Sequence, residues 1–220
     1  MTSLGTIPAL RGLPPERLDD LGRRARAARF AAGDLLRRAG ASASDVVLLL
    51  SGTVVATHET AGGGEVWPGR WTGPTIADKP AVLSGEPSPT GLRATTAVTA
   101  RLLPAADFRR LLHDEPEVRD HVLAALARDA LAGRRELVRS ATLPAVARVA
   151  TRLLDQDPSR RTAWPGSQDD LARTLGLSRV TVNRALNRLS RAAAVRLSPN
   201  GVTVTDRSRL ADFTAPENDA

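Results

Sequence analysis

Hydrophobic and polar positions follow different periods in different parts of the chain. Residues 4–27 have short helical patterns, in which Pro14-Pro15-Glu16 can begin a helix. From Phe30 to Leu103, glycines separate short apolar runs, a pattern typical of an antiparallel β-sandwich or barrel. The expected strands are Val46–Leu50, Thr53–Ala56, Ala81–Leu83, Ala94–Val98 and Ala100–Leu103.

Helical periodicity returns after Pro104. This proline can begin a short helix, and Pro116 lies at the start of a longer one. Apolar residues in the longer segment recur at i, i+3, i+4, i+7 and i+8, which predicts one stripe along the helix. The stripe comprises Leu123, Leu126, Ala127, Ala130, Leu131, Leu137 and Val138. The stripe fits either packing within its own domain or a seam between two subunits. Gly133 lowers the stability of the helix, and Arg134 interrupts the stripe.

The C-terminal third has the pattern of helices joined by a tight turn. We expect a hinge at Ser140–Pro144, followed by a helix. Ser167 precedes acidic residues, as at a helix N-cap, and Gly176 ends that helix. Ser178 can cap the next helix. Its inner face consists of Val182, Ala185, Leu186 and Leu189. Because the outer face is rich in Arg and Asn, the pair of helices predicts a helix-turn-helix.

A β-hairpin is expected directly after the second of these helices. The runs Val195–Leu197 and Val202–Thr205 flank Ser198-Pro199-Asn200-Gly201, and Asn-Gly between β-branched runs is a strong hairpin signal. A hairpin in this position is a wing. Ser208–Phe213 is expected to form a closing helical turn, and residues 214–220 a disordered tail.

Composition narrows the chemistry. The 220 residues include no cysteine, which excludes disulfides, thiolate zinc sites and iron–sulfur clusters. The three histidines lack a metal-ligand spacing, so no metal site is expected. The longest apolar stretch, Val46–Leu50, is far shorter than the roughly 20 residues of a membrane helix. The start MTSLGTIPALRGL does not resemble a signal peptide, so we expect a cytoplasmic protein with no membrane partner.

The distribution of charge separates the C-terminal third from the rest. The formal net charge is +7, and residues 139–213 hold 13 arginines and six aspartates, with no lysine or glutamate. These residues therefore carry all the excess charge. A coding bias for Arg and Ala is the alternative explanation of the basic composition, since Lys79 is the only lysine. A basic module joined to a neutral one favours a polyanionic partner, most often nucleic acid.

Three stretches resemble the CRP/FNR family of bacterial transcription regulators. The winged helix of this family is similar to the stretch SQDDLARTLGLSRVTVNRALNRL followed by GVTVTD in this chain. Its cyclic-nucleotide-binding-type β-roll resembles RFAAGDLLRRAGASASDVVLLLSGTV, with Gly33, Gly40 and Gly52 at tight turns. The end of that β-roll and the entry to the dimerisation helix resemble TAVTARLLPAADFRRLL.

The resemblance implies an α+β fold. It implies an N-terminal antiparallel β-roll of the jelly-roll type over residues 1–115 and a long dimerisation helix over 116–139. A C-terminal winged helix-turn-helix would then occupy residues 140–213. The dimer interface implied by the stripe comprises Leu123, Leu126, Ala127, Ala130, Leu131 and Leu137.

The resemblance also implies how DNA is contacted. The recognition helix, Ser178–Ser190, would enter the major groove. Arg179, Val180 and Arg184 fall at the positions that read bases in the family. The whole expected contact set is Gln168, Ser178, Arg179, Val180, Thr181, Asn183, Arg184, Arg188 and, in the wing, Arg196. A solvated helix face is the alternative for Arg188. Many relatives have Glu where this chain has Val180, so we expect contact with a thymine methyl instead of cytosine N4.

The effector pocket departs from the family pattern. Members that bind cyclic AMP hold its phosphate with a Gly-Glu pair and an Arg-Ser or Arg-Thr pair. Here Gly73-Pro74 and Ser88-Pro89 fall at those places, and Arg93 is the nearby substitute. Because both charged residues are missing, we expect no cyclic AMP cofactor. Heme ligation by His58, His113 or His121 rests on residue type alone.

These observations favour a sequence-specific, homodimeric transcription regulator. Its expected partners are double-stranded DNA and its own copy, with RNA polymerase as a further candidate. The alternatives are a sensor whose DNA binding depends on cyclic AMP or another small ligand, and a non-specific architectural DNA binder. No P-loop, Gly-x-Ser-x-Gly or zincin motif occurs, so an enzyme is not expected.

Overall fold

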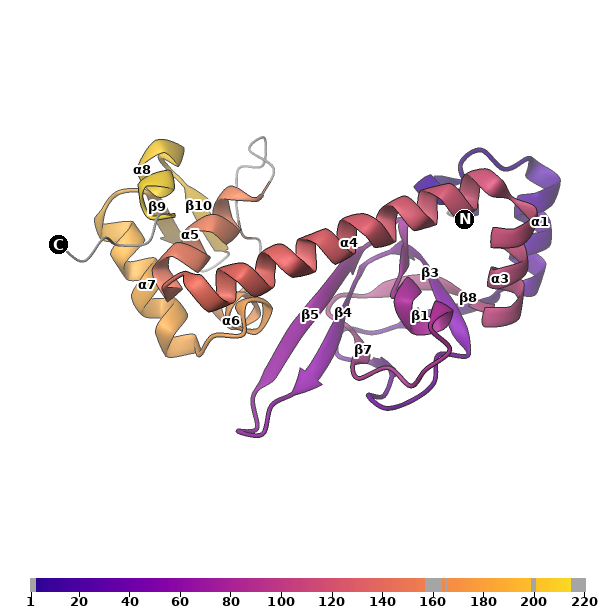
Figure 1. The fold of residues 1–220 in the computed structure, drawn as a ribbon, viewed down its shortest axis with the longest axis horizontal. Coiled ribbons are helices and arrows are strands. Elements are labelled where there is room, and N and C mark those ends of the chain that lie inside the picture. Colours follow the sequence, from indigo (N-terminus) through magenta and orange to yellow (C-terminus); the bar gives the residue numbers. More distant parts are fainter. Residues whose placement is uncertain (1–2, 157–163, 165, 199–200, 215–220) are drawn as a thin grey trace. The chain divides into compact units, whose positions relative to one another are not determined.

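The computed structural model describes residues 3–156, 164, 166–198 and 201–214 (Figure 1). The chain divides into two compact units, Met1–Ala130 and Leu131–Ala220. The sequence placed domain boundaries at residues 116 and 140, whereas this division falls within the long helix. Of the expected tail, residues 215–220 lie outside the described residues.

The N-terminal unit combines short helices with β-strands (Figure 1). Its helical segments before the strands are η1 (Leu4–Thr6), η2 (Pro8–Leu10) and α1 (Pro15–Arg24). Its strands are β1 (Arg26–Phe30), β2 (Leu35–Arg37), β3 (Asp45–Ser51), β4 (Thr53–Glu59), β5 (Glu65–Thr72), β6 (Thr75–Ala77), β7 (Gly91–Ala94) and β8 (Val98–Pro104). Helix α2 (Lys79–Leu83) lies between β6 and β7, and α3 (Ala105–Asp114) follows β8.

Within the described residues, these strands form two antiparallel sheets in the orders β1-β8-β3-β6 and β2-β7-β4-β5. Inner residues such as Leu49, Val54 and Leu92 form one core. Leu48 on β3 instead packs with Phe108 of α3 in a second core. Strand β3 is thus buried on both faces, which explains its uninterrupted apolar run. The antiparallel β-roll expected from the sequence is confirmed.

Two of the expected strands are wrong. Ala81–Leu83 belongs to α2, because Pro80 cannot donate to a sheet ladder but fits the first turn of a helix. Ala94–Val98 straddles the end of β7 and the start of β8. Between these strands, the Thr96 hydroxyl accepts a hydrogen bond from Thr53 N–H at 2.9 Å. Residues 26–27, expected to be helical, begin β1.

Gly52 makes the tight turn between β3 and β4. Its φ is 88°, which L side chains rarely adopt. An added Cβ would lie 2.2 Å from the carbonyl oxygen of Ala97. Glycine is therefore required here for both its conformation and its lack of a side chain.

Helix α4 spans Pro116–Thr142, so it is longer than the predicted 116–139. The expected hinge, Ser140–Pro144, is helical up to Thr142. Val118 and Val122 are buried in the N-terminal core, and Leu126 is half-buried against the same core. Leu126, which the sequence assigns to a subunit seam, also packs on the core of its own unit.

The C-terminal unit contains short helices and a hairpin (Figure 1). Its elements after α4 are α5 (Ala145–Leu154), α6 (Gln168–Leu175), α7 (Arg179–Arg191), β9 (Val195–Ser198), β10 (Gly201–Val204) and α8 (Arg207–Asp212). Its core includes Leu153, Trp164, Leu171, Leu186 and Leu210. This core fixes α7 while leaving one of its faces in solvent. The winged helix-turn-helix fold expected from the sequence is confirmed.

Candidate nucleic-acid interface

Helix α6 begins with a reciprocal cap. The Ser167 hydroxyl accepts from Asp170 N–H at 3.0 Å, and the Asp170 carboxylate accepts from Ser167 N–H at 3.1 Å. These bonds satisfy backbone donors that the first helical turn leaves without partners. Arg148 of α5 donates to the carbonyl oxygen of Leu175 at the other end of α6. Both ends of α6 are thus held by side chains.

Gly176 and Ser178 make the turn between α6 and α7. Gly176 has φ 61° and ψ 34°, the left-handed conformation that ends many helices. The following Leu177 N–H donates to Ala172 O at 3.0 Å. The Ser178 hydroxyl then accepts from Thr181 N–H at 3.0 Å and caps α7. The turn expected at these residues is therefore present.

Helix α7 has one buried face and one exposed face. Val182, Ala185, Leu186 and Leu189 are buried in the core of the unit. The exposed residues are Arg179, Val180, Asn183, Arg184, Asn187, Arg188 and Arg191. Val180, in the first turn of α7, is an apolar residue with 59% exposure on this otherwise polar face. A helix with a rigid inner face and an Arg- and Asn-rich outer face suits insertion into a major groove.

The exposed face contains a polar network that joins α7 to α6. Asn183 Nδ2 donates to Gln168 Oε1 at 3.1 Å, and Asn187 Nδ2 donates to Asn183 Oδ1 at 2.6 Å. The Arg179 guanidinium lies 3.4 Å from the carboxylate of Asp169. Asn187 was missed by the sequence analysis, although its i+4 spacing from Asn183 placed it on the same face.

Arg184 differs from Arg179 in having no partner among the residues that the structure describes. Among the described residues, its guanidinium forms no hydrogen bond or ion pair, and the side chain is exposed. Its five N–H donors are therefore available to an acceptor from outside the protein. Guanine O6 and N7 are acceptors that match this donor geometry.

Thr181 and Arg188, both expected to contact DNA, have intramolecular contacts. Thr181 is half-buried, and its hydroxyl lies 2.8 Å from that of Ser178 at the cap. The Arg188 guanidinium lies 5.7 Å from the centre of the Phe213 ring. These contacts give Ser178 and Thr181 a capping role and place Arg188 against the closing segment of the unit.

The wing follows α7 as expected. Strands β9 and β10 pair antiparallel, with Arg196 opposite Thr203 and Ser198 opposite Gly201. Pro199 and Asn200, the predicted turn, lie outside the described residues. Trp164 pairs with Val202 through backbone hydrogen bonds of 3.1 Å, and this contact extends the hairpin. Arg196 is exposed on the wing.

The residues assigned to the effector pocket have contacts within the protein. Gly73 N–H donates to Gly52 O at 2.9 Å, and Pro74 follows it in the turn between β5 and β6. The Ser88 hydroxyl lies 3.2 Å from that of Thr90. Arg93 donates to Gly33 O at 3.2 Å and lies 3.5 Å from the Glu65 carboxylate.

An ion pair that the sequence analysis missed lies beside these residues. Asp78, just before α2, pairs with Arg37 of β2, and both side chains are nearly buried. Arg37 also donates to the carbonyl oxygen of Thr90 at 3.4 Å. Burial raises the pKa of Asp78, and the Arg37 hydrogen bond opposes that change. The partners are 41 positions apart, so no local pattern indicated them.

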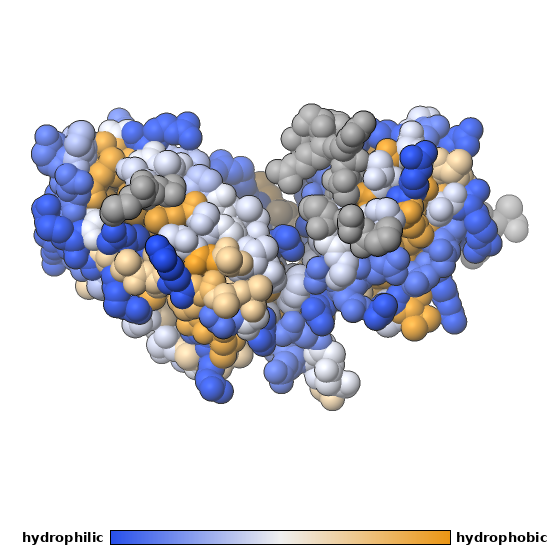
Figure 2. Space-filling model, turned by 180° about the vertical axis from the view of Figure 1, so that it is seen from behind, coloured by the Kyte–Doolittle hydropathy of each residue, from blue (hydrophilic) through white to orange (hydrophobic). Residues whose placement is uncertain are grey.

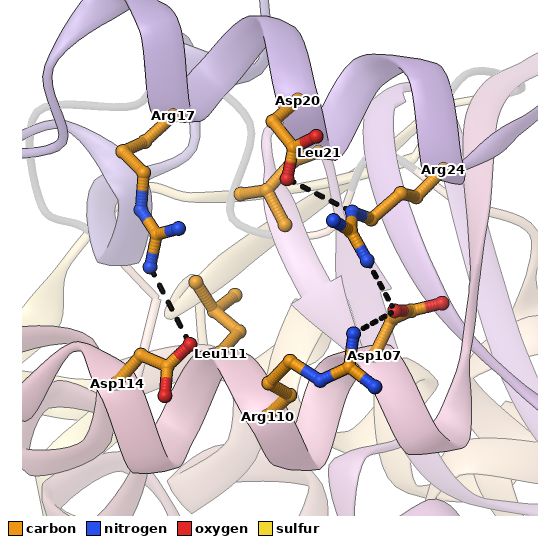
Figure 3. A pocket seen from close by; sticks show the side chains of 8 residues that line it. All are labelled: Arg17, Asp20, Leu21, Arg24, Asp107, Arg110, Leu111 and Asp114. Carbon is orange, nitrogen blue, oxygen red and sulfur yellow. Dashed lines mark hydrogen bonds and ion pairs between the residues drawn. The ribbon is translucent and has the colours of Figure 1, made fainter.

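A groove between α1 and α3 is lined by charged side chains of both signs (Figure 3). Arg24 bridges Asp20 and Asp107 at 2.8 and 3.2 Å, and Arg17 lies 3.6 Å from Asp114. Its three arginines face three aspartates, and its volume is about 40 Å³. We therefore interpret the groove as an ion-pair network that ties the two helices together.

The histidines do not gather at one place. His58 Nδ1 lies 3.2 Å from Pro89 O, His113 is in the last turn of α3 and His121 is on α4. In the part of the chain that the structure describes, no cluster of three His, Asp or Glu side chains could hold a metal ion. Over the same residues, no helix is long and apolar enough to cross a membrane.

The geometry defines a class of protein, one that joins a β-roll domain to a winged helix-turn-helix domain. Residues 147–213 match the Crp-like helix-turn-helix domain, and residues 27–115 match the cyclic nucleotide-binding domain. The chain therefore belongs to the CRP/FNR family and is a DNA-binding transcription regulator, not an enzyme. Comparison with curated proteins finds no match.

Solved structures share the fold. FixK2 from Bradyrhizobium japonicum is 20% identical, with a TM-score of 0.75 over 87% of this chain and 98% of that chain. The c-di-GMP-responsive regulator CLP from Xanthomonas campestris is 18% identical, with a TM-score of 0.75 over 87% and 99%. The catabolite activator protein of Thermus thermophilus is 24% identical, with a TM-score of 0.54 over 94% and 98%. At these identities, the likeness concerns the fold.

Proposed function

We propose that the protein is a cytoplasmic homodimer that reads a near-palindromic DNA site with α7. Arg179, Val180 and Arg184 contact base edges, while Arg196 of the wing contacts phosphate. The observation that carries this proposal is the exposed Arg184 guanidinium, without a partner among the described residues, on the same face as exposed Val180. RNA polymerase stays a candidate partner.

A dimer is supported by the outward stripe of α4. Leu123, Leu131 and Leu137 are 56%, 49% and 69% exposed in the single chain. At about 100° per residue they lie on one side of the helix, together with exposed Ala127 and Ala130. The side that carries Val118 and Val122 packs on the N-terminal core. An exposed apolar stripe of this length fits a seam with the same stripe of a second copy.

Base reading by Arg184 is tested with a matched pair of variants. Arg184→Ala and Arg191→Ala each remove one exposed arginine of α7. We expect Arg184→Ala to cost about 1–3 kcal/mol on a selected site and to relax the base preference there. Arg191→Ala, at the last residue of the helix, should change specific and random binding equally. Fluorescence anisotropy on selected and scrambled duplexes measures both. Equal losses on the two duplexes for Arg184→Ala would refute base reading.

A further inference from the structure

Asn187 lies in the middle of the exposed face of α7, where the sequence analysis assigned it no role. At about 100° per residue, it lies about 20° around the helix from Val180 and two turns further along. It is exposed and takes part in neither the core of the unit nor the N-cap of α7. Its side chain therefore has no structural task in the body of the unit.

Three amide side chains, those of Gln168, Asn183 and Asn187, form a chain of hydrogen bonds with one direction. Asn187 Nδ2 donates to Asn183 Oδ1 at 2.6 Å, and Asn183 Nδ2 donates to Gln168 Oε1 at 3.1 Å. Asn183 thus uses both its donor group and its acceptor group within the protein. Asn187 uses one N–H donor, and within the described residues its Oδ1 accepts no hydrogen bond. This amide chain therefore leaves an acceptor and a second donor at Asn187.

The groups that remain at Asn187 match adenine. Asn187 Oδ1 can accept from adenine N6, and the second Nδ2 proton can donate to adenine N7, the bidentate contact by which asparagine recognises adenine in the major groove. Because the first Nδ2 proton is bound to Asn183, the amide is already held before DNA binds. Less side-chain entropy is then lost on binding.

We propose that Asn187 reads an adenine next to the guanine read by Arg184, and that Asn183 is the positioning residue that holds the Asn187 amide. Arg184 and Asn187 are three residues apart, about 4.5 Å along the helix, which is close to the roughly 3.4 Å rise of one base pair. The inference rests on the proposed function, because it requires α7 to lie in the major groove.

A phosphate contact is the competing role for Asn187. Phosphate oxygens only accept hydrogen bonds, so a phosphate would use the second Nδ2 proton and leave Asn187 Oδ1 without a donor. Adenine uses both groups. The direction of the amide chain therefore favours a base over the backbone of DNA as the partner of Asn187.

A panel of duplexes tests the base contact. In one half-site of a selected operator, each base pair is changed in turn to the other three, and fluorescence anisotropy gives the dissociation constants. Arg184→Ala identifies the guanine position. For the unchanged protein, we expect replacement of the adenine beside that guanine to weaken binding about 5- to 150-fold, the range for one bidentate contact. Asn187→Ala should bind the four duplexes that differ at this base pair about equally and should keep the guanine preference.

Asn183→Ala tests the positioning role on the same panel. Removal of the acceptor for Asn187 Nδ2 should reduce the adenine preference at that base pair and leave the guanine preference of Arg184 unchanged. A general disturbance of α7 would instead weaken both preferences together. Loss of preference at a different base pair would show that Asn183 itself reads DNA and would overturn its positioning role.

Arg191→Ala is the matched control, because it removes another exposed side chain of α7 and should leave every base preference unchanged. Both asparagines are exposed, so the thermal midpoints of their variants should equal that of the unchanged protein. The proposal is overturned if Asn187→Ala keeps the adenine preference, loses a preference for another base, or weakens binding equally on all duplexes. Each of these results leaves the guanine preference of Arg184 intact. Failure of the proposed function would differ, because the unchanged protein would then show no base preference at all.

Discussion

Arg179 and Arg184 share the exposed face of α7 but differ in their surroundings. Arg179 is paired with Asp169 at 3.4 Å, and both side chains are largely exposed. An exposed pair of this kind contributes about 0.2–1 kcal/mol, whereas a bidentate contact with guanine discriminates by about 1–3 kcal/mol. If Arg179 reads a base as proposed, exchange of the carboxylate for the base would therefore be favourable. Asp169 would then hold the Arg179 side chain near that position before DNA binds.

Val180 is expected to set a second, separable base preference. It is exposed and has no role in the core, so Val180→Glu should fold normally. A glutamate accepts a hydrogen bond from cytosine N4, whereas valine contacts the thymine methyl. We expect the preferred base to change from thymine to cytosine at one position of each half-site. Competition between duplexes that differ at this base pair measures the change.

Val180→Ala is the control, because alanine keeps the methyl contact and should keep the thymine preference. If the glutamate variant selects the same base as the unchanged protein, Val180 does not contact DNA as proposed.

At the scale of elements, α4 has two different sides. One side packs on the N-terminal core through Val118, Val122 and half-buried Leu126, and the other exposes the apolar stripe. A charge at Leu126 would therefore damage its own unit, whereas a charge at Leu131 would act only in a seam between copies.

Leu131→Asp should give monomers. Burial of two copies of an unpaired carboxylate in the seam costs several kcal/mol. Ala132→Asp, an exposed neighbour turned about 100° away, should stay dimeric. Sedimentation velocity at micromolar concentration measures both. A Leu131→Asp protein that sediments as a dimer, or an unchanged protein that is already monomeric, contradicts the seam.

The elements also show what local sequence can and cannot specify. The caps at Ser167 and Ser178 and the stop at Gly176 depend on neighbouring residues, so they were predictable. Strand β1 contains Arg26 and Arg29 and is largely exposed; it is extended because it pairs with β8, more than 60 positions away. The Gln168–Asn183 and Arg37–Asp78 contacts likewise depend on tertiary packing, which no local pattern encodes.

At the scale of the whole molecule, each unit has its own electrostatic character. The formal positive charge is concentrated in residues 139–213. On the face that Figure 2 shows, each unit exposes hydrophobic patches among hydrophilic residues. Where the family pattern predicts a nucleotide phosphate, Ser88 and Pro89 carry no charge, and Arg93 is held by Gly33 and Glu65.

Cyclic AMP should therefore leave DNA binding unchanged. Loss of two charge-assisted hydrogen bonds, at about 1.5–3 kcal/mol each, weakens binding of a cyclic phosphate by about two to four orders of magnitude. Calorimetry with cyclic AMP and cyclic GMP, together with anisotropy on DNA in their presence, measures both effects. Micromolar binding would show that Arg93 or another cation replaces the missing residues.

Sequence-specific recognition by a dimer is the central claim, and in vitro selection from random duplexes tests it most directly. The account predicts enrichment of an inverted repeat whose half-sites are centred about 10–10.5 base pairs, or a multiple of that distance, apart. The Arg184→Ala protein should fail to enrich the same half-site. Binding that enriches no sequence over the starting pool would contradict the account and indicate a non-specific architectural protein.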